Sequence, residues 1–103
     1  MEKVIIESPF AGDTERNILY LKECMKDCFK RGEAPFASHL LYTQILDDLI
    51  PNERTLGIEA GLEWGKVSDK VVVYQDYGLS HGMKLGIDRA IKEKRKIEYR
   101  RIY

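Results

Sequence analysis

The chain has 103 residues with 17 basic and 17 acidic side chains, so its formal net charge is zero. This length allows one domain with a single core, spanning residues 1–103, and a hydrophobic content of 44% excludes a disordered chain. The balanced charge argues against nucleic acid as a partner, and no apolar run approaches the ~18 residues of a membrane span. The N-terminal apolar stretch is too short for a signal peptide, so we expect a cytoplasmic protein without membrane contact.

The first third of the chain predicts a strand, a long helix and a second strand. The run KVIIE is typical of a short buried strand, and the proline and glycine of SPFAGD indicate a loop after it. Apolar residues at helical spacing then continue as far as Gly32, and Asp13 or Thr14 can cap this helix. In chain order, these elements are a strand at 3–7, a loop at 8–13, a helix ending near 31 and a strand at 34–37.

The rest of the chain predicts two strands and several helical segments. KVVVYQ is the clearest strand, because it is β-branched and aromatic over its whole length. Asn52 can cap the helix before this strand, and Ser80 can cap the helix after it. In chain order, these elements are a partly helical segment at 38–50, a helix at about 53–67, a strand at 70–75, a loop at 76–80, a helix at 81–94 and a strand at 97–102.

Strands and helices therefore alternate from end to end, as in βαβ units built around a parallel sheet. The sequence predicts an α/β fold: a single Rossmann-like (flavodoxin-like) parallel sheet of about four to five strands, flanked by helices. Ligands of such open sheets lie outside the carboxyl ends of the strands. We therefore expect one ligand site, built from the loops at 8–13, 38–42 and 76–83.

The cysteines and the C-terminal basic residues have structural explanations. Cys24 and Cys28 lie four residues apart in a predicted helix, without the further ligands that a metal site needs, so we expect buried small apolar residues. The basic residues near the C-terminus predict a solvated tail first and an anion-binding patch second. They are Lys92, Lys94, Arg95, Lys96, Arg100 and Arg101.

The loop SPFAGD ends a strand and opens a helix, which is a favourable place for an anion. Free backbone N–H groups and the positive end of the helix dipole meet there, so we expect these amides to hold a phosphate. The motif is neither GxGxxG nor a Walker sequence, and a tight turn with Asp13 as the helix cap is the alternative.

The two histidines, His39 and His81, both lie in loops on the expected ligand edge. Aromatic rings there can stack on a base or sugar, imidazoles can donate hydrogen bonds, and Asp76 can hold a ribose hydroxyl. We predict no catalytic residue, metal ligand or cofactor. The expected ligand-binding residues are Ser8, Pro9, Phe10, Gly12, Asp13, His39, Asp76, Tyr77, Ser80, His81 and Met83.

Three glycines, Gly57, Gly61 and Gly65, recur every four residues along the helix at 53–67. Each weakens a helix by ~1 kcal/mol relative to alanine, so the stripe indicates close approach of another segment. That segment is either the sheet of the same chain or the same helix of a second chain. Glu59 and Glu63 share another face, where they form either a solvated surface or a pair of reactive carboxylates.

Four sequence elements together resemble the nucleoside 2-deoxyribosyltransferase-like superfamily, and more closely its small relatives in phage and bacterial genomes. The resemblance spans about residues 3–99. It depends on SPFAGD, on APFASHLLY, on Arg54 and Gly57 before Asp69, and on the turn of Ser80, Gly82 and Met83.

The resemblance implies a nucleoside- or nucleotide-binding domain in which a glutamate of the helix after the third strand attacks the sugar carbon. Gly86 occupies that position here, and glycine has no group that could attack carbon. The implied binding site is therefore retained, whereas its nucleophile is missing from this helix.

Three hypotheses follow. The first is a non-catalytic protein that binds a nucleotide or ribosyl phosphate, for example one that sequesters a nucleotide signal of host defence in the cytoplasm of a phage-infected cell. The second is an N-glycosidase or deoxyribosyltransferase whose carboxylate has moved to Glu59, Glu63 or Asp76. The third is a protein-interaction module. We also expect a homo-oligomer, most simply a two-fold dimer, with the helix at 52–67 and Trp64 near its interface.

Overall fold

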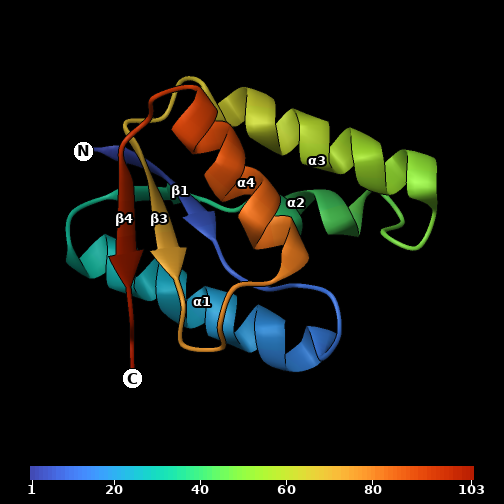
Figure 1. Cartoon of the computed structure of the whole chain (residues 1–103). Helices are drawn as coiled ribbons and strands as arrows, with labels where there is room; N and C mark the ends of the chain where they lie inside the picture. Colours follow the sequence, from blue (N-terminus) through green and yellow to red (C-terminus); the bar gives the residue numbers. More distant parts are fainter.

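A computed structural model describes all 103 residues and has a four-stranded sheet with the strand order β2-β1-β3-β4 (Figure 1). All three strand pairs are parallel, which confirms the predicted α/β fold with a single Rossmann-like sheet. This is the start of the flavodoxin-like order. The elements are β1 Lys3–Glu7, α1 Thr14–Lys30, β2 Ala34–Phe36, α2 Ser38–Leu41, the 3₁₀ helix η1 Tyr42–Gln44, α3 Pro51–Gly65, β3 Lys70–Tyr74, α4 His81–Lys92 and β4 Ile97–Arg100.

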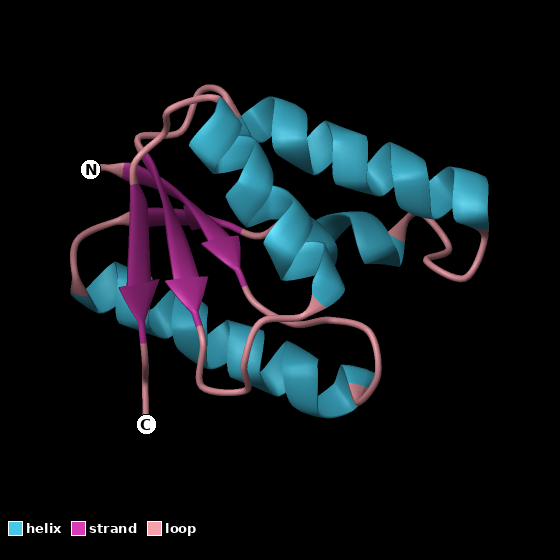
Figure 2. Ribbon diagram, viewed as in Figure 1, coloured by secondary structure: helices cyan, strands magenta, loops and turns pink.

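Helix α1 packs on one face of the sheet and α4 packs on the other (Figure 2). Successive strand residues point to opposite faces, so the two central strands, β1 and β3, contribute to two separate cores. The core under α1 includes Cys24 and Cys28, which are buried and unpaired, as predicted. The core under α4 consists of Val71, Val73, Met83, Ile87 and Ala90.

The third helix, α3, lies beside α4 and α2, beyond the sheet (Figure 1). It begins at Pro51, which fits the first helical turn because proline lacks the N–H that would be unpaired there. The predicted start, with Asn52 as the cap, is therefore wrong by two residues. No helix of the structure combines the length and the apolar character that would let it cross a membrane.

The last strand is shorter than predicted, because β4 ends at Arg100 rather than at residue 102. The N–H of Ile102 donates to the carboxylate of Asp76, at 2.9 Å from Oδ1, instead of continuing the ladder with β3. A side chain from the loop after β3 thus anchors the end of the chain.

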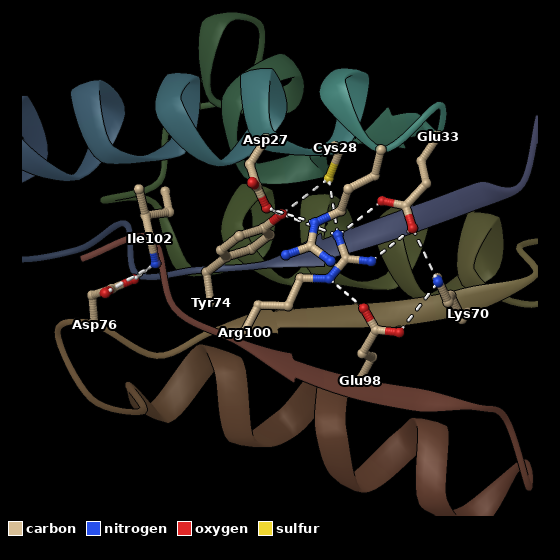
Figure 3. A network of polar contacts seen from close by, with 10 residues as sticks. Asp27, Cys28, Glu33, Lys70, Tyr74, Asp76, Glu98, Arg100 and Ile102 are labelled. Atoms are coloured by element: carbon tan, nitrogen blue, oxygen red, sulfur yellow. Dashed lines mark hydrogen bonds and ion pairs between the residues drawn. The ribbon is translucent and has the colours of Figure 1, made fainter.

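A buried ionic cluster lies between α1 and the sheet (Figure 3). Both guanidinium NH groups of Arg100 donate to Glu33, at 2.8 and 2.6 Å, and Lys70 Nζ lies 3.0 Å from the same carboxylate. The Arg100 hydrogen bonds are the main cause that lowers the pKa of Glu33 to about 2. The expectation of a solvated basic tail is wrong for Arg100, which is 5% exposed, because this carboxylate binds it in the interior.

Removal of the Glu33 carboxylate is expected to destabilise the chain strongly. Glu33→Ala leaves Arg100 and Lys70 with only the more exposed Glu98 as a shared carboxylate, and breaking such a buried pair costs about 3–5 kcal/mol. Urea unfolding measures this loss. The matched control is Glu63→Ala, which removes an exposed ion pair with Lys66 and is expected to cost less than about 1 kcal/mol. Equal losses in the two variants would contradict a stabilising role for the cluster.

Candidate functional site

A cleft of about 190 Å³ lies between α4 on one side and α2 and α3 on the other. It extends from the carboxyl end of β1 and the end of the loop after β3 to Val71 and Arg95, near the amino ends of β3 and β4. From β1 the chain continues to β2 on one side of it, and β3 later pairs with β1 on the other side. The topological switch point of the sheet therefore lies between β1 and β3. The sequence predicted a ligand site at this edge. Of the predicted residues, the cleft brings together Ser8, Phe10, His39, Ser80, His81 and Met83.

Ser8 and His39 form a hydrogen-bonded pair in the cleft, with 2.8 Å between Ser8 Oγ and His39 Nε2. Burial lowers the pKa of His39 to about 4, so its imidazole is neutral near pH 7. The ring of Phe10 packs edge-on against this imidazole, with 6.4 Å between the ring centroids. The cleft therefore presents a neutral polar pair beside an aromatic surface.

The sequence analysis missed Glu7, the last residue of β1. The two-residue period of the strand turns Glu7 toward α4, whereas Ile6 points into the core under α1. Its half-buried carboxyl lies in the cleft, where desolvation raises its pKa to about 8 although the charge of Arg95 opposes the rise. An acidic residue at the end of an otherwise apolar strand, KVIIE, was the sequence signal that could have identified it.

Glycines on α3 and α4 make room for the polar groups of the cleft. A Cβ at residue 61 would lie 2.5 Å from Ser38 Oγ, and one at residue 65 would lie 2.6 Å from a guanidinium nitrogen of Arg95. A Cβ at Gly86 would overlap the carboxyl group of Glu7. The glycine stripe thus contacts the same chain, but its neighbours are α2 and Arg95 rather than the expected sheet.

Two arginines line the cleft. Arg54 NH1 donates to Asp48 Oδ2 at 3.0 Å, which fixes the guanidinium at the start of α3. Arg95 donates to the hydroxyl of Ser68, while its buried Nε has no hydrogen-bond partner. Arg95 was expected in a solvated tail; instead the space above Gly65 admits its side chain to the interior.

Asp76 and Tyr77 lie outside the cleft, toward α1. The Asp76 carboxylate accepts a hydrogen bond from the Tyr20 hydroxyl at 2.6 Å and others from the backbone N–H groups of the last two residues. The ring of Tyr77 packs on that of Tyr20 with centroids 4.6 Å apart, and the guanidinium of Arg16 lies 4.1 Å from its centroid. These side chains make contacts within the chain and do not line the cleft with the other predicted site residues.

The start of α1 also lies away from the cleft. Asp13 is the helix cap, because its carboxylate accepts from the N–H of Arg16 at 3.1 Å, and the N–H of Thr14 donates to the carbonyl of Gly12 at 2.9 Å. Pro9 is buried in the preceding turn. These bonds use the amides of Thr14 and Arg16 in the first turn of α1, so phosphate binding by the amides of residues 8–13 stays a prediction. At α4, by contrast, the expected cap is confirmed, since Ser80 Oγ accepts from the N–H of Met83.

The carboxylates proposed from the sequence as relocated nucleophiles are not in the cleft. Glu59 and Glu63 are exposed on α3, and Lys66 Nζ lies 2.9 Å from Glu63, which agrees with a solvated face. Asp76 has its partners on the other side of the sheet. No group of three or more histidine, cysteine, aspartate or glutamate side chains is arranged to hold a metal ion.

A family model described as Domain of unknown function (DUF7768) matches residues 2–100, so the chain belongs to this family. The match covers every strand and helix and the whole cleft. No curated protein matches the chain.

The raised pKa of Glu7 predicts a stability difference that depends on pH. The folded chain retains a proton on Glu7 that the unfolded chain loses above about pH 4.5, so ionisation destabilises the fold as the pH rises toward 8. Glu7→Gln removes this penalty. At pH 9 the variant is expected to melt at least about 4 °C above the wild type, which corresponds to ~1 kcal/mol, and the two should melt together below pH 4.5.

Thermal unfolding followed by circular dichroism from pH 4 to pH 9 measures this difference. Arg95 stays protonated over this range and His39 titrates in both proteins, so their contributions largely cancel in the comparison. Glu59→Gln, which removes an exposed carboxylate outside the cleft, is the control and should show no such trend. A stability gap between Glu7→Gln and wild type that is the same at every pH would contradict the prediction.

Proposed function

We propose that this member of the DUF7768 family binds a small ribosyl ligand, a nucleoside or nucleotide, in the cleft between α3 and α4. The observation that carries the proposal is the convergence of polar side chains from separate elements at the switch point. Glu7 comes from β1, His39 from α2, Arg54 from α3 and Arg95 from the segment after α4. Few polar groups that converge in a concave site are the usual mark of small-molecule recognition.

The size of the cleft supports a ligand that is only partly enclosed. Its volume of about 190 Å³ is smaller than the ~300–1,000 Å³ of typical small-molecule sites. This is suitable for a sugar with its neighbouring atoms, while a base or phosphate extends into the open mouth. The resemblance to the nucleoside 2-deoxyribosyltransferase-like superfamily supports the same class of ligand.

We propose binding without catalysis as the first candidate. Gly86, at the position where the resemblance implies a nucleophilic glutamate, has no side chain. Ser8 and His39 form a pair, but His39 Nδ1 has no carboxylate partner to orient the ring. A protein of this kind would sequester its ligand, for example a nucleotide signal in a phage-infected cell.

A second candidate, N-glycosidic bond cleavage, is favoured by the position of Glu7. Its carboxyl group fills the space where a side chain at residue 86 would begin, so the cleft contains a carboxyl group although α4 does not supply it. Glu7 therefore replaces Glu59, Glu63 and Asp76 as the residue to test for this activity.

The expected homo-oligomer stays a prediction. Because Gly61 faces Ser38 of its own chain, the stripe no longer supports a contact between two copies of α3, and Gly61→Leu would disturb the fold itself. The exposed apolar side chains Leu56 and Trp64 on this helix leave a protein-interaction module as a further hypothesis.

Calorimetric titration with nucleoside monophosphates, ADP-ribose and cyclic nucleotides tests ligand binding. Phe10→Ala and His39→Ala each remove a cleft contact and are expected to weaken binding by roughly 5- to 150-fold, or ~1–3 kcal/mol. The control Phe29→Ala removes an exposed ring on α1 and should bind like the wild type. Two outcomes would contradict the proposal: no probe binds at millimolar concentration, or both cleft variants bind a probe with the affinity of the wild type.

Release of free base separates the two candidates. We expect the wild type to release none from nucleoside monophosphates in overnight incubations analysed by chromatography, since the helix after β3 lacks a nucleophile. Turnover near one per second, a common enzymatic rate, would instead establish the second candidate. In that case Glu7→Gln should abolish release while Glu59→Gln retains it.

A further inference from the structure

Glu7 occupies a place that the fold has shaped for its side chain. A Cβ at residue 86 would have the carboxyl carbon and both carboxyl oxygens of Glu7 as its three nearest atoms. Gly86 is itself buried in α4, where glycine is less favourable than alanine. Helix α4 therefore has a residue of low helix propensity at the position where a side chain would displace the Glu7 carboxyl group.

The same carboxyl group has no partner within the chain. Glu7 takes part in no side-chain hydrogen bond or ion pair, and Arg95 acts on it only through its charge. The buried acid Glu33, by contrast, accepts hydrogen bonds from Arg100 and forms an ion pair with Lys70. The Glu7 side chain is partly buried, and its carboxyl group faces the cleft without a partner from the chain, so it is free to bind a group that enters the cleft.

The surroundings of Glu7 select the chemistry of that partner. Arg54 and Arg95 line the same cleft, which disfavours a cationic group beside Glu7. A hydroxyl suits Glu7 in either protonation state, because it can both donate to and accept from a carboxyl group. Two carboxyl oxygens side by side match two hydroxyls on adjacent carbons.

We infer that Glu7 binds the adjacent hydroxyls of a ribose, and that the cleft therefore prefers ribosyl over 2-deoxyribosyl ligands. This inference rests on the proposed function, since it names the sugar that the cleft recognises. A ligand without the 2-hydroxyl leaves one Glu7 oxygen unpaired in a partly desolvated site, which lowers its affinity.

Two pairs of probes test the inference by calorimetry: ribose 5-phosphate with 2-deoxyribose 5-phosphate, and AMP with 2′-deoxy-AMP. The wild type is expected to bind the ribosyl member of each pair about 5- to 100-fold more tightly. Glu7→Leu should reduce this ratio to about one. Glu7→Gln, whose amide still donates and accepts, should keep most of it.

A second variant, in α4, changes the position of the same carboxyl group. Gly86→Ala introduces a Cβ that displaces the Glu7 carboxyl group, so it should also reduce the ratio even though Glu7 is present. Glu59→Leu, outside the cleft, is the control and should keep the ratio of the wild type. The ratio within one variant is insensitive to how much of that protein is folded.

The outcomes distinguish the inference from the proposed function. Equal affinity for both members of each pair in the wild type would overturn the inference and leave ligand binding in the cleft intact. An undiminished ratio in Glu7→Leu would place the discrimination at another residue and would overturn it as well. If no member of either pair binds at millimolar concentration, the inference and ribosyl ligand binding fail together.

Discussion

The close packing of α4 on the carboxyl end of β1 is the constraint on which the site depends. At Gly86 the helix approaches a strand residue that carries a carboxyl group, and the absence of a Cβ lets both occupy the same region. Gly61 and Gly65 on α3 allow the same approach to Ser38 and Arg95. Small residues on the two helices thus convert what would be an apolar interface into a cleft lined with polar groups.

The carboxyl groups of Glu33 and Glu7, on opposite faces of the sheet, differ in whether the chain supplies a partner. Glu33, under α1, receives two cations, and this pairing offsets the cost of removing its charge from water. Glu7, under α4, receives none, and its pKa rises to about 8. Because the sheet separates the two, one face contains a polar network satisfied within the chain, and the other contains groups left available to a ligand.

The sequence predicted the fold more fully than the site. It placed the strands in alternation with helices, and it grouped Ser8, His39 and His81, which line one cleft in the structure. It did not separate the loop residues that enter the cleft from those, such as Asp76 and Tyr77, that turn toward α1. The reason is that a loop has no periodicity from which the direction of its side chains can be derived.

The sequence by itself determined those features that depend only on residues a few positions away in the chain. Strand and helix periodicity, the caps at Asp13 and Ser80, and the burial of the cysteines belong to this class. The tertiary structure alone decided the pairing of Glu33 with Arg100, 67 positions apart, and the meeting of Glu7 with Gly86. Pairing and desolvation of charges depend on which distant segments the sheet and its helices bring into contact, and no local pattern records that.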